Sequence, residues 1–149
     1  MPQYERFAWG SLLASVLSWL FLTMRMTEDW MVVDVLPGHM IRTYGAVVVL
    51  MIVAHAVLGG LLHVRGEGRA EKDERDLAIA ARAERIEGLV VVLAVNVLII
   101  HALAQAAFAG HALPSIDLGV LPVLFYALLS VLFLGHTIGQ LVTIWQYRA

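Results

Sequence analysis

Residues 65–87 read RGEGRAEKDERDLAIAARAERIE and form the one densely charged part of the chain. They hold six of the ten Lys and Arg residues and seven of the twelve Asp and Glu residues. Long apolar runs lie on both sides of them. A charged segment between two such runs is typical of an arm between membrane-spanning helices, so this segment sets the topology of the chain.

The composition is that of a membrane protein. Of the 149 residues, 60% are hydrophobic and 15% are charged, and the mean hydropathy is +0.81. Soluble domains average about 45–50% apolar and about 25% charged residues. The net charge of -2 argues against a nucleic-acid partner, which requires a basic surface. The chain has no cysteine, which excludes disulfides, thiolate metal sites and cysteine nucleophiles.

Four apolar runs are long enough to cross a bilayer as helices, because a span needs about 20 residues. The runs are 7–24, 43–64, 89–108 and 118–145. Their residues do not alternate between apolar and polar as the strands of a membrane β-barrel do. We therefore expect an all-α polytopic membrane protein. Residues 1–149 form a single integral membrane domain, a bundle of four transmembrane helices with a charged cytoplasmic helical arm over residues 65–87.

Lys and Arg residues are unevenly distributed between the two sides of this bundle. The N-terminal tail, the arm and the C-terminal tail together hold eight of the ten, whereas the connections 25–42 and 109–117 hold two. The side with the excess of Lys and Arg faces the cytoplasm. We expect a multi-pass protein of the inner cell membrane with both termini cytoplasmic.

The connection after the first span contains Thr27, Asp29 and Trp30, followed by Pro37 and Gly38. Thr and Asp are good N-terminal caps, and Pro-Gly is a frequent stop. We expect Thr27 or Asp29 to cap a short interfacial helix that carries Trp30 and ends at Pro37-Gly38.

The arm itself is expected to be helical. It contains no Gly or Pro between Glu71 and Glu87 and is rich in alanine, so the helix should run into the third span, with a bend at Gly88. A balanced mixture of acids and bases is common on a solvated helix face. It also suits a docking surface for a cytoplasmic partner or for a second copy of the chain. The residues that we assign to this interaction are Asp73, Glu74, Arg75, Asp76 and Arg82.

This charged entry to a membrane helix carries a family resemblance. It reads Lys72-Asp73-Glu74-Arg75-Asp76, with Ile79 and Arg82-Ala83 after it. Over residues 71–95 and in its helical hairpins, the chain resembles small predicted prokaryotic four-helix membrane proteins of unknown function, with an Asp-Glu-Arg-Asp charged helix before the third span. The resemblance implies the architecture and implies no activity, cofactor or site residue.

Polar side chains within the spans are the candidates for chemistry, because each is costly in lipid unless it is paired. With a rise of about 1.5 Å per residue, His55 and His136 reach the inner half of the membrane, whereas His101 lies near the outer edge. We therefore expect His55 and His136 to meet without His101. The span centres contain no Asp, Glu, Lys or Arg, which argues against a proton pump or an ion-coupled carrier.

Two interpretations of the histidine pair are open. Imidazole nitrogens bind haem iron and metal ions, so His55 and His136 are candidate ligands of a b-type haem or of a metal site. Alternatively, each histidine forms a structural hydrogen bond to a neighbouring helix. We expect the structural role and no cofactor, with haem b as the alternative.

Small residues mark one face of the fourth span. Gly135 and Gly139 form a Gly-x-x-x-Gly motif, which lets helix backbones approach closely. This face packs either within the bundle or against a second subunit in a homo-oligomer.

Phosphate-binding loops, nucleophile elbows and zinc-protease motifs are missing from the sequence. We therefore expect a non-enzymatic membrane protein that lies in the lipid bilayer and acts as an accessory, scaffolding or regulatory subunit. It would pack through its small-residue faces and dock a membrane or cytoplasmic partner through the arm. The alternative is a haem- or metal-binding redox or transport protein that uses His55 and His136.

Overall fold

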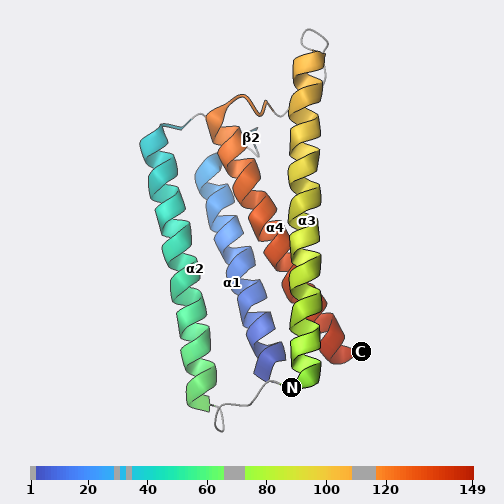
Figure 1. The fold of residues 1–149 in the computed structure, drawn as a ribbon. Coiled ribbons are helices and arrows are strands. Elements are labelled where there is room, and N and C mark those ends of the chain that lie inside the picture. The colour runs from blue at the N-terminus through green and yellow to red at the C-terminus, as the bar shows by residue number, and fades with distance from the viewer. Residues whose placement is uncertain (1–2, 29–30, 33–34, 66–72, 109–116) are drawn as a thin grey trace.

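The computed structural model describes residues 3–28, 31–32, 35–65, 73–108 and 117–149. Its helices are α1 (Gln3–Met26), α2 (Pro37–Arg65), α3 (Glu74–Ala107) and α4 (Leu121–Arg148), as Figure 1 shows. Two short strands, β1 (Thr27–Glu28) and β2 (Met31–Val32), lie between α1 and α2. All four helices are long and apolar enough to cross a membrane, which confirms the expected all-α four-helix architecture.

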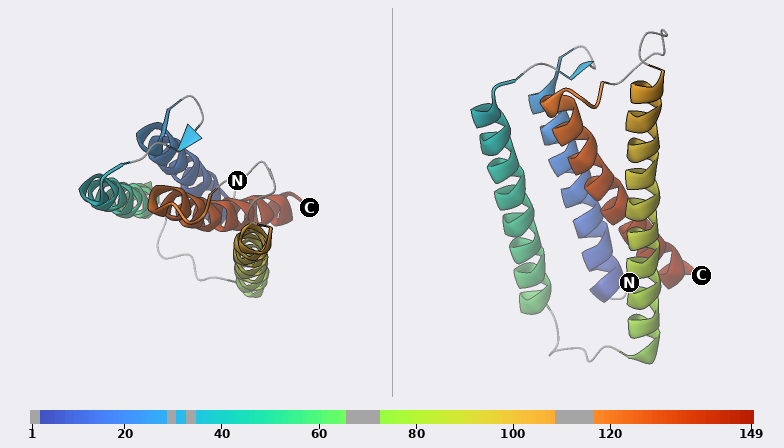
Figure 2. Two further views of the ribbon diagram at one scale, coloured as in Figure 1. Left: turned by 90° about the horizontal axis from the view of Figure 1, so that it is seen from above. Right: turned by 45° about the horizontal axis from the view of Figure 1, so that its top comes forward.

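The two central helices of the bundle are α1 and α4. Helix α1 packs against α2 and α4, and α4 packs against α1 and α3. Helices α2 and α3 consequently lie on opposite sides (Figure 2). Both chain termini and the start of α3 lie at one end of the bundle, which we call the terminal end; the other end is the far end. The part of the charged arm that forms the start of α3 therefore lies at the same end as the two termini.

The outer helices bury few of their side chains. Only 6% of the residues in the most apolar stretch of α2 are buried, and the most apolar stretch of α3 has no buried residue. Both stretches consist largely of Val, Leu, Ile and Ala. Such surfaces are costly in water but suit a lipid environment, in which an apolar helix face needs no protein cover.

A hydrophobic core fills the far half of the bundle. Its buried members are Leu22, Met26, Met40, Val47 and Phe133. Two pairs of polar side chains beside this core connect α1 and α4. The Trp19 indole N–H donates to Ser130 Oγ at 3.0 Å, and the Thr23 and Tyr126 hydroxyls lie 3.0 Å apart. These pairs satisfy groups that are costly to leave unpaired in a low-dielectric interior.

Helix α3 begins with a capping box. The Asp76 N–H donates to Asp73 Oδ1 at 2.7 Å, and the Asp73 N–H faces Asp76 Oδ2 at 3.4 Å. The helix then continues without a break through Gly88, so the expected bend there is wrong (Figure 1). Residues 66–72 of the arm lie outside the described part of the chain.

The expected interfacial helix after α1 is also wrong. Thr27 and Glu28 pair with Val32 and Met31, respectively, as antiparallel strands. The Thr27 hydroxyl donates back to the Thr23 carbonyl at 2.8 Å, so it serves the end of α1 and caps no new helix. Asp29 and Trp30 lie outside the described residues.

Helix α2 starts earlier than the expected span. Pro37 is its first residue, where we expected a stop. Proline suits a first helical position, because its fixed φ matches the helix and its missing N–H would have had no partner there.

Candidate functional site

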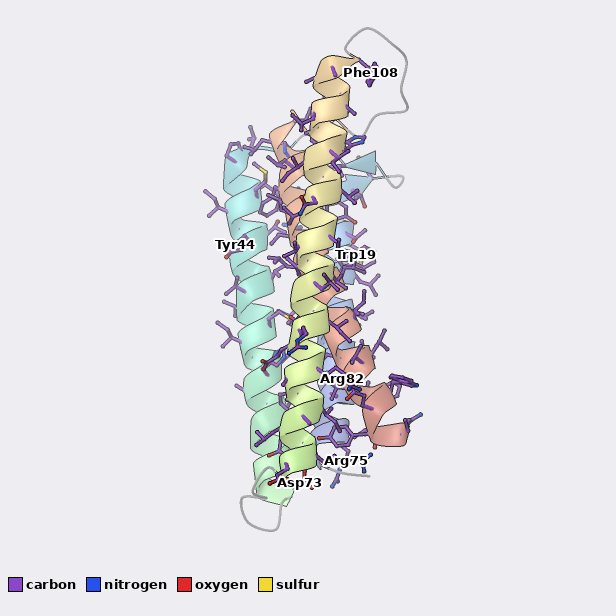
Figure 3. All side chains as sticks on the ribbon, turned by 45° about the vertical axis from the view of Figure 1, so that its right-hand side comes forward. Trp19, Tyr44, Asp73, Arg75, Arg82 and Phe108 are labelled. Atoms are coloured by element: carbon purple, nitrogen blue, oxygen red, sulfur yellow. The ribbon has the colours of Figure 1, made fainter. Side chains whose placement is uncertain are left out.

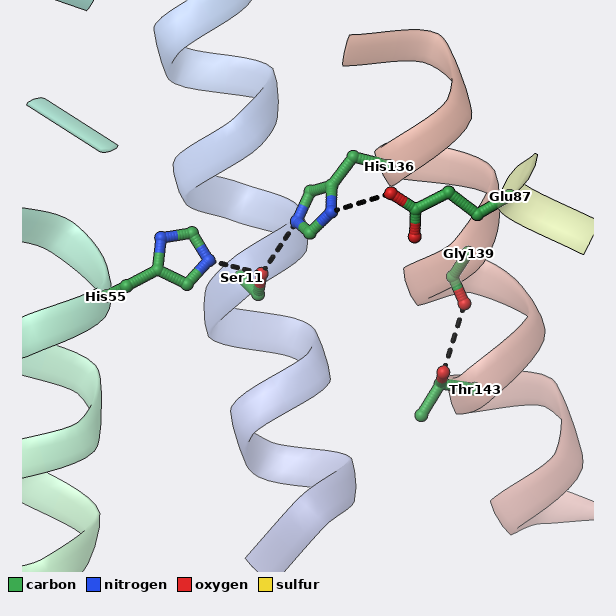
Figure 4. Close-up of polar contacts among 6 residues, drawn as sticks. All are labelled: Ser11, His55, Glu87, His136, Gly139 and Thr143. Carbon is green, nitrogen blue, oxygen red and sulfur yellow. Dashed lines mark hydrogen bonds and ion pairs between the residues drawn. The ribbon is translucent and has the colours of Figure 1, made fainter. Parts of the chain in front are cut away.

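Four polar side chains, one from each helix, form a chain of contacts across the bundle (Figure 4). Ser11 Oγ of α1 lies 2.9 Å from His55 Nε2 of α2 and 3.0 Å from His136 Nε2 of α4. His136 Nδ1 in turn lies 3.5 Å from Glu87 Oε1 of α3. We call Glu87, His136, Ser11 and His55 the polar network.

The two histidines meet as their depths predicted. Their ring centroids are 5.9 Å apart with the planes at 64°, and the Phe7 ring packs edge-on against His55 at 6.1 Å. Counting about 1.5 Å per residue from the span ends at Phe7 and Trp145, Ser11 lies roughly 6 Å and His136 roughly 14 Å inside the apolar zone. The polar network therefore lies in the terminal half of the bundle.

The His55 end of the polar network is held by the helix backbone. His55 Nδ1 lies 2.8 Å from the Met51 carbonyl oxygen. A carbonyl oxygen only accepts, so Nδ1 carries a hydrogen and donates it. In a neutral His55 the other nitrogen, Nε2, is then an acceptor that faces the Ser11 hydroxyl.

The hydrogen bonds of the polar network use every hydrogen that its neutral groups supply. Three hydrogen bonds connect the Met51 carbonyl, His55, Ser11 and His136. Each neutral imidazole brings one hydrogen, the serine hydroxyl brings one, and a carboxylate brings none. The contact of His136 Nδ1 with Glu87 is at ion-pair distance and would need one added proton, with which the polar network would have no net charge.

The surroundings of the polar network make this proton important. Ser11 is fully buried, and the side chains of His136 and Glu87 are 26% and 35% exposed. Without the extra proton, the Glu87 carboxylate would face an unprotonated Nδ1 lone pair in a low-dielectric setting. An unpaired charge that is partly shielded from water is costly.

The small-residue face of α4 receives Glu87 and its neighbour on α3. Gly135 and Gly139 are buried in the described structure. A Cβ at Gly135 would overlap Val91 Cγ2, and a Cβ at Gly139 would lie 2.6 Å from Glu87 Oε2 and 3.2 Å from Glu87 Cβ. The Gly-x-x-x-Gly face thus packs against a helix of the same chain and lets Glu87 reach His136.

The charged residues assigned to docking fall into two groups. Figure 3 labels three of them, Asp73, Arg75 and Arg82, along the first turns of α3. Asp73 and Asp76 form the capping box of α3, and Tyr147 Oη donates to Asp76 Oδ1 at 2.5 Å. The Arg75 guanidinium donates to the Gln146 carbonyl at 3.3 Å, at the C-terminal end of α4. These three residues hold the start of α3 to its own chain. Glu74 and Arg82, by contrast, are exposed.

The space around the two histidines does not suit a porphyrin. Ser11 Oγ lies within hydrogen-bond distance of both Nε2 atoms, so α1 occupies the place where the macrocycle would extend. The glycines beside His136, Gly135 and Gly139, face Val91 and Glu87. Among the described residues, no three or more His, Cys, Asp or Glu side chains are grouped to hold a metal ion.

The order Ser11–His136–Glu87 resembles the order of a hydrolase triad, but its geometry does not suit nucleophilic attack. Ser11 is fully buried and contacts two histidines at once. A nucleophilic hydroxyl needs a free approach for the substrate carbonyl. The arrangement is instead suited to holding a proton and shifting it along hydrogen bonds.

Sequence reasoning missed two of the four residues of the polar network. Ser11 was not among the polar residues of the spans that we singled out, and Glu87 was counted with the charged arm. The argument against proton chemistry, that no carboxylate lies within a span, loses its basis because Glu87 contacts His136. One signal was present: Glu87 is the last acid before the apolar run of α3.

No family model, curated protein or solved structure matches this chain. The resemblance to small prokaryotic four-helix membrane proteins therefore stays a prediction.

Proposed function

We propose that this protein is a non-enzymatic regulatory membrane protein that binds one proton in the polar network and changes its helix packing when the proton leaves. The observation that carries the proposal is the 3.5 Å approach of Glu87 Oε1 to His136 Nδ1. The three hydrogen bonds of the network use all three hydrogens of the neutral side chains, so an ion pair at this contact needs one added proton. A histidine is suited to this task because it titrates near physiological pH in the absence of perturbation.

The packing of α3 on α4 couples the proton to the shape of the bundle. The Glu87 carboxylate contacts His136 on one side and the Gly139 backbone position on the other. When the proton leaves, Glu87 faces a lone pair and gains by moving toward water. Because Val91 is seated against Gly135 one turn further along, this movement separates α3 from α4.

The start of α3 carries this change to the membrane surface. Asp76 and Arg75 connect the first turn of α3 to Tyr147 and Gln146, at the end of α4. A shift of α3 therefore alters the charged surface at the terminal end. The excess of Lys and Arg supports an inner-membrane location with this end in the cytoplasm.

The Glu87→Gln variant tests the proposal. The glutamine amide can donate to His136 Nδ1, so the network is complete without a bound proton. In the wild type, the proposed ion pair exists only while the added proton is bound. Wild-type stability, measured between about pH 6 and about pH 9, should therefore fall as the pH rises, by at most about 1.4 kcal/mol per pH unit. The stability of Glu87→Gln should be nearly constant over that range.

Thermal unfolding in detergent or nanodiscs across this pH range measures the effect. Glu74→Gln is the matched control, because Glu74 is an exposed acid on the same helix that belongs neither to the polar network nor to the cavity beside Glu87. This control should keep the wild-type pH dependence. Equal pH slopes for the wild type and Glu87→Gln would contradict the proposal.

An accessory role through docking is the second candidate, and one observation favours it. Glu74 and Arg82 are exposed at the terminal end, and neither residue has the intrachain role that Arg75 and Asp76 have. They are therefore free to contact a cytoplasmic partner or a second copy of the chain through complementary charge.

Charge reversal at these two positions tests the docking role. Glu74→Arg/Arg82→Glu keeps the net charge and leaves the capping box of α3 intact. After gentle extraction, native mass spectrometry should show a bound partner chain or a second copy for the wild type and its loss in the double variant. A wild-type protein that is a bare monomer, or an assembly unchanged by the reversal, would count against docking through this face.

A further inference from the structure

A cavity of about 240 Å³ lies between α1, α3 and α4 at the terminal end of the bundle. We call it the entry cavity. It is large enough to hold several water molecules. Residues in its wall include Tyr4, Phe7, Glu84, Glu87, Gln140 and Thr143. One member of the polar network, Glu87, is thus part of the cavity wall.

The groups around the entry cavity are suited to proton exchange with water. The titratable side chains that line it are Tyr4 from α1, Asp76, Glu84 and Glu87 from α3, and Tyr147 from α4. Helix α2 faces the network from the other side with His55. No Lys or Arg side chain is among the described residues that line the cavity. A surplus of carboxylates attracts protons to the Glu87 end of the network.

The opposite end of the polar network ends in a helix backbone. His55 Nδ1 donates to the Met51 carbonyl, and this contact ends the chain of hydrogen bonds in a helix backbone. Beyond Ser11, the next residues of α1 on the same face, Ser15 and Ser18, are fully buried. The apolar core around Leu22 and Met26, both 0% exposed, follows them. An apolar core excludes water and hydrated protons.

From these two ends we infer that the polar network exchanges its proton only through the entry cavity, with the compartment at the terminal end. This inference rests on the proposed function and specifies it: the protein senses the pH of one side of the membrane and does not conduct protons across it. Gln140 and Thr143 are wall residues that water reaches, whereas Ser18 lies in the closed half.

Single-cysteine labelling tests the access route, because the chain has no cysteine of its own. The probe variants are Gln140→Cys and Thr143→Cys in the cavity wall. Leu141→Cys is the matched control, since Leu141 lies beside Gln140 on α4 but is 47% exposed on the helix surface outside the cavity lining. Ser18→Cys probes the closed half with a conservative change. A charged, membrane-impermeant thiol reagent is applied to sealed proteoliposomes of known orientation.

The expected result is that Gln140→Cys and Thr143→Cys react only when the reagent is on the terminal side. Leu141→Cys and Ser18→Cys should stay unreacted from both sides. Labelling of Ser18→Cys, or labelling of the wall variants from the far side, would overturn the inference. So would failure of both wall variants to react from the terminal side.

Proton flux into the same proteoliposomes provides a second readout. A pH-sensitive dye inside them should report no flux above that of protein-free liposomes, and a flux that Glu87→Gln removes would overturn the inference. The outcome is separable from that of the proposed function. One-sided labelling with no pH dependence of stability would refute the proton site alone. A pH dependence that Glu87→Gln removes, together with two-sided labelling, would refute one-sided access alone.

Discussion

The His136→Ala variant is expected to lose about 1–2 kcal/mol of unfolding free energy. The imidazole contacts both Ser11 and Glu87, so its removal leaves a carboxylate in the bundle without its partner. Deleting one partner of a buried ion pair costs about 3–5 kcal/mol, whereas an exposed pair contributes at most about 1 kcal/mol. An intermediate loss applies here because the side chains of His136 and Glu87 are 26% and 35% exposed. Reversible unfolding in mixed detergent micelles measures the loss.

A double variant separates the lost charge pair from the lost packing. In His136→Ala/Glu87→Gln, no unpaired carboxylate remains, so at least about half of the lost stability should return. Leu134→Ala is a control on the same helix, where Leu134 is 48% exposed and faces away from the network. Two outcomes would show that the His136–Glu87 pair does not stabilise the bundle. In one, His136→Ala is as stable as Leu134→Ala or more stable. In the other, the double variant is as unstable as His136→Ala.

Gly135→Ala is expected to lose about 1–3 kcal/mol, although alanine is the better helix former. Its Cβ would overlap Val91 Cγ2 and lie 3.4 Å from the Glu87 carbonyl oxygen, so α3 must move away from α4. Gly139→Ala should cost less, because the atom nearest its Cβ is the end of the flexible Glu87 side chain. Thermal unfolding of the two variants in the same detergent shows which of them loses more stability.

Gly60→Ala is the matched control for these helix glycines. No atom lies within 4 Å of a Cβ at Gly60, so this variant should be neutral or gain up to about 1 kcal/mol from the higher helix propensity of alanine. If Gly135→Ala were as stable as Gly60→Ala, this would show that α3 does not pack closely against α4 at Gly135. The displacement of Glu87 in Gly135→Ala should also weaken the pH dependence of stability.

Much of the architecture followed from one-dimensional information. Long apolar runs can satisfy their backbone groups in lipid only as helices, so four runs of span length predicted four helices. The depth of a residue along its helix follows from the rise per residue, so the meeting of His55 with His136 was also predictable. The local errors, at Gly88 and at Thr27–Val32, arose where several backbone conformations have similar energies and the contacts of neighbouring segments decide.

The sequence by itself determined that this is an apolar four-helix chain, with a charged segment at the end that carries both termini and two histidines at a shared level. Only the tertiary structure decided which residues those histidines contact. Ser11 looked like a packing residue and Glu87 like a solvated acid, because depth along a helix does not specify which neighbour a side chain faces. That direction depends on how the helices pack. Here the small Gly135/Gly139 face lets α3 approach α4 until Glu87 contacts His136.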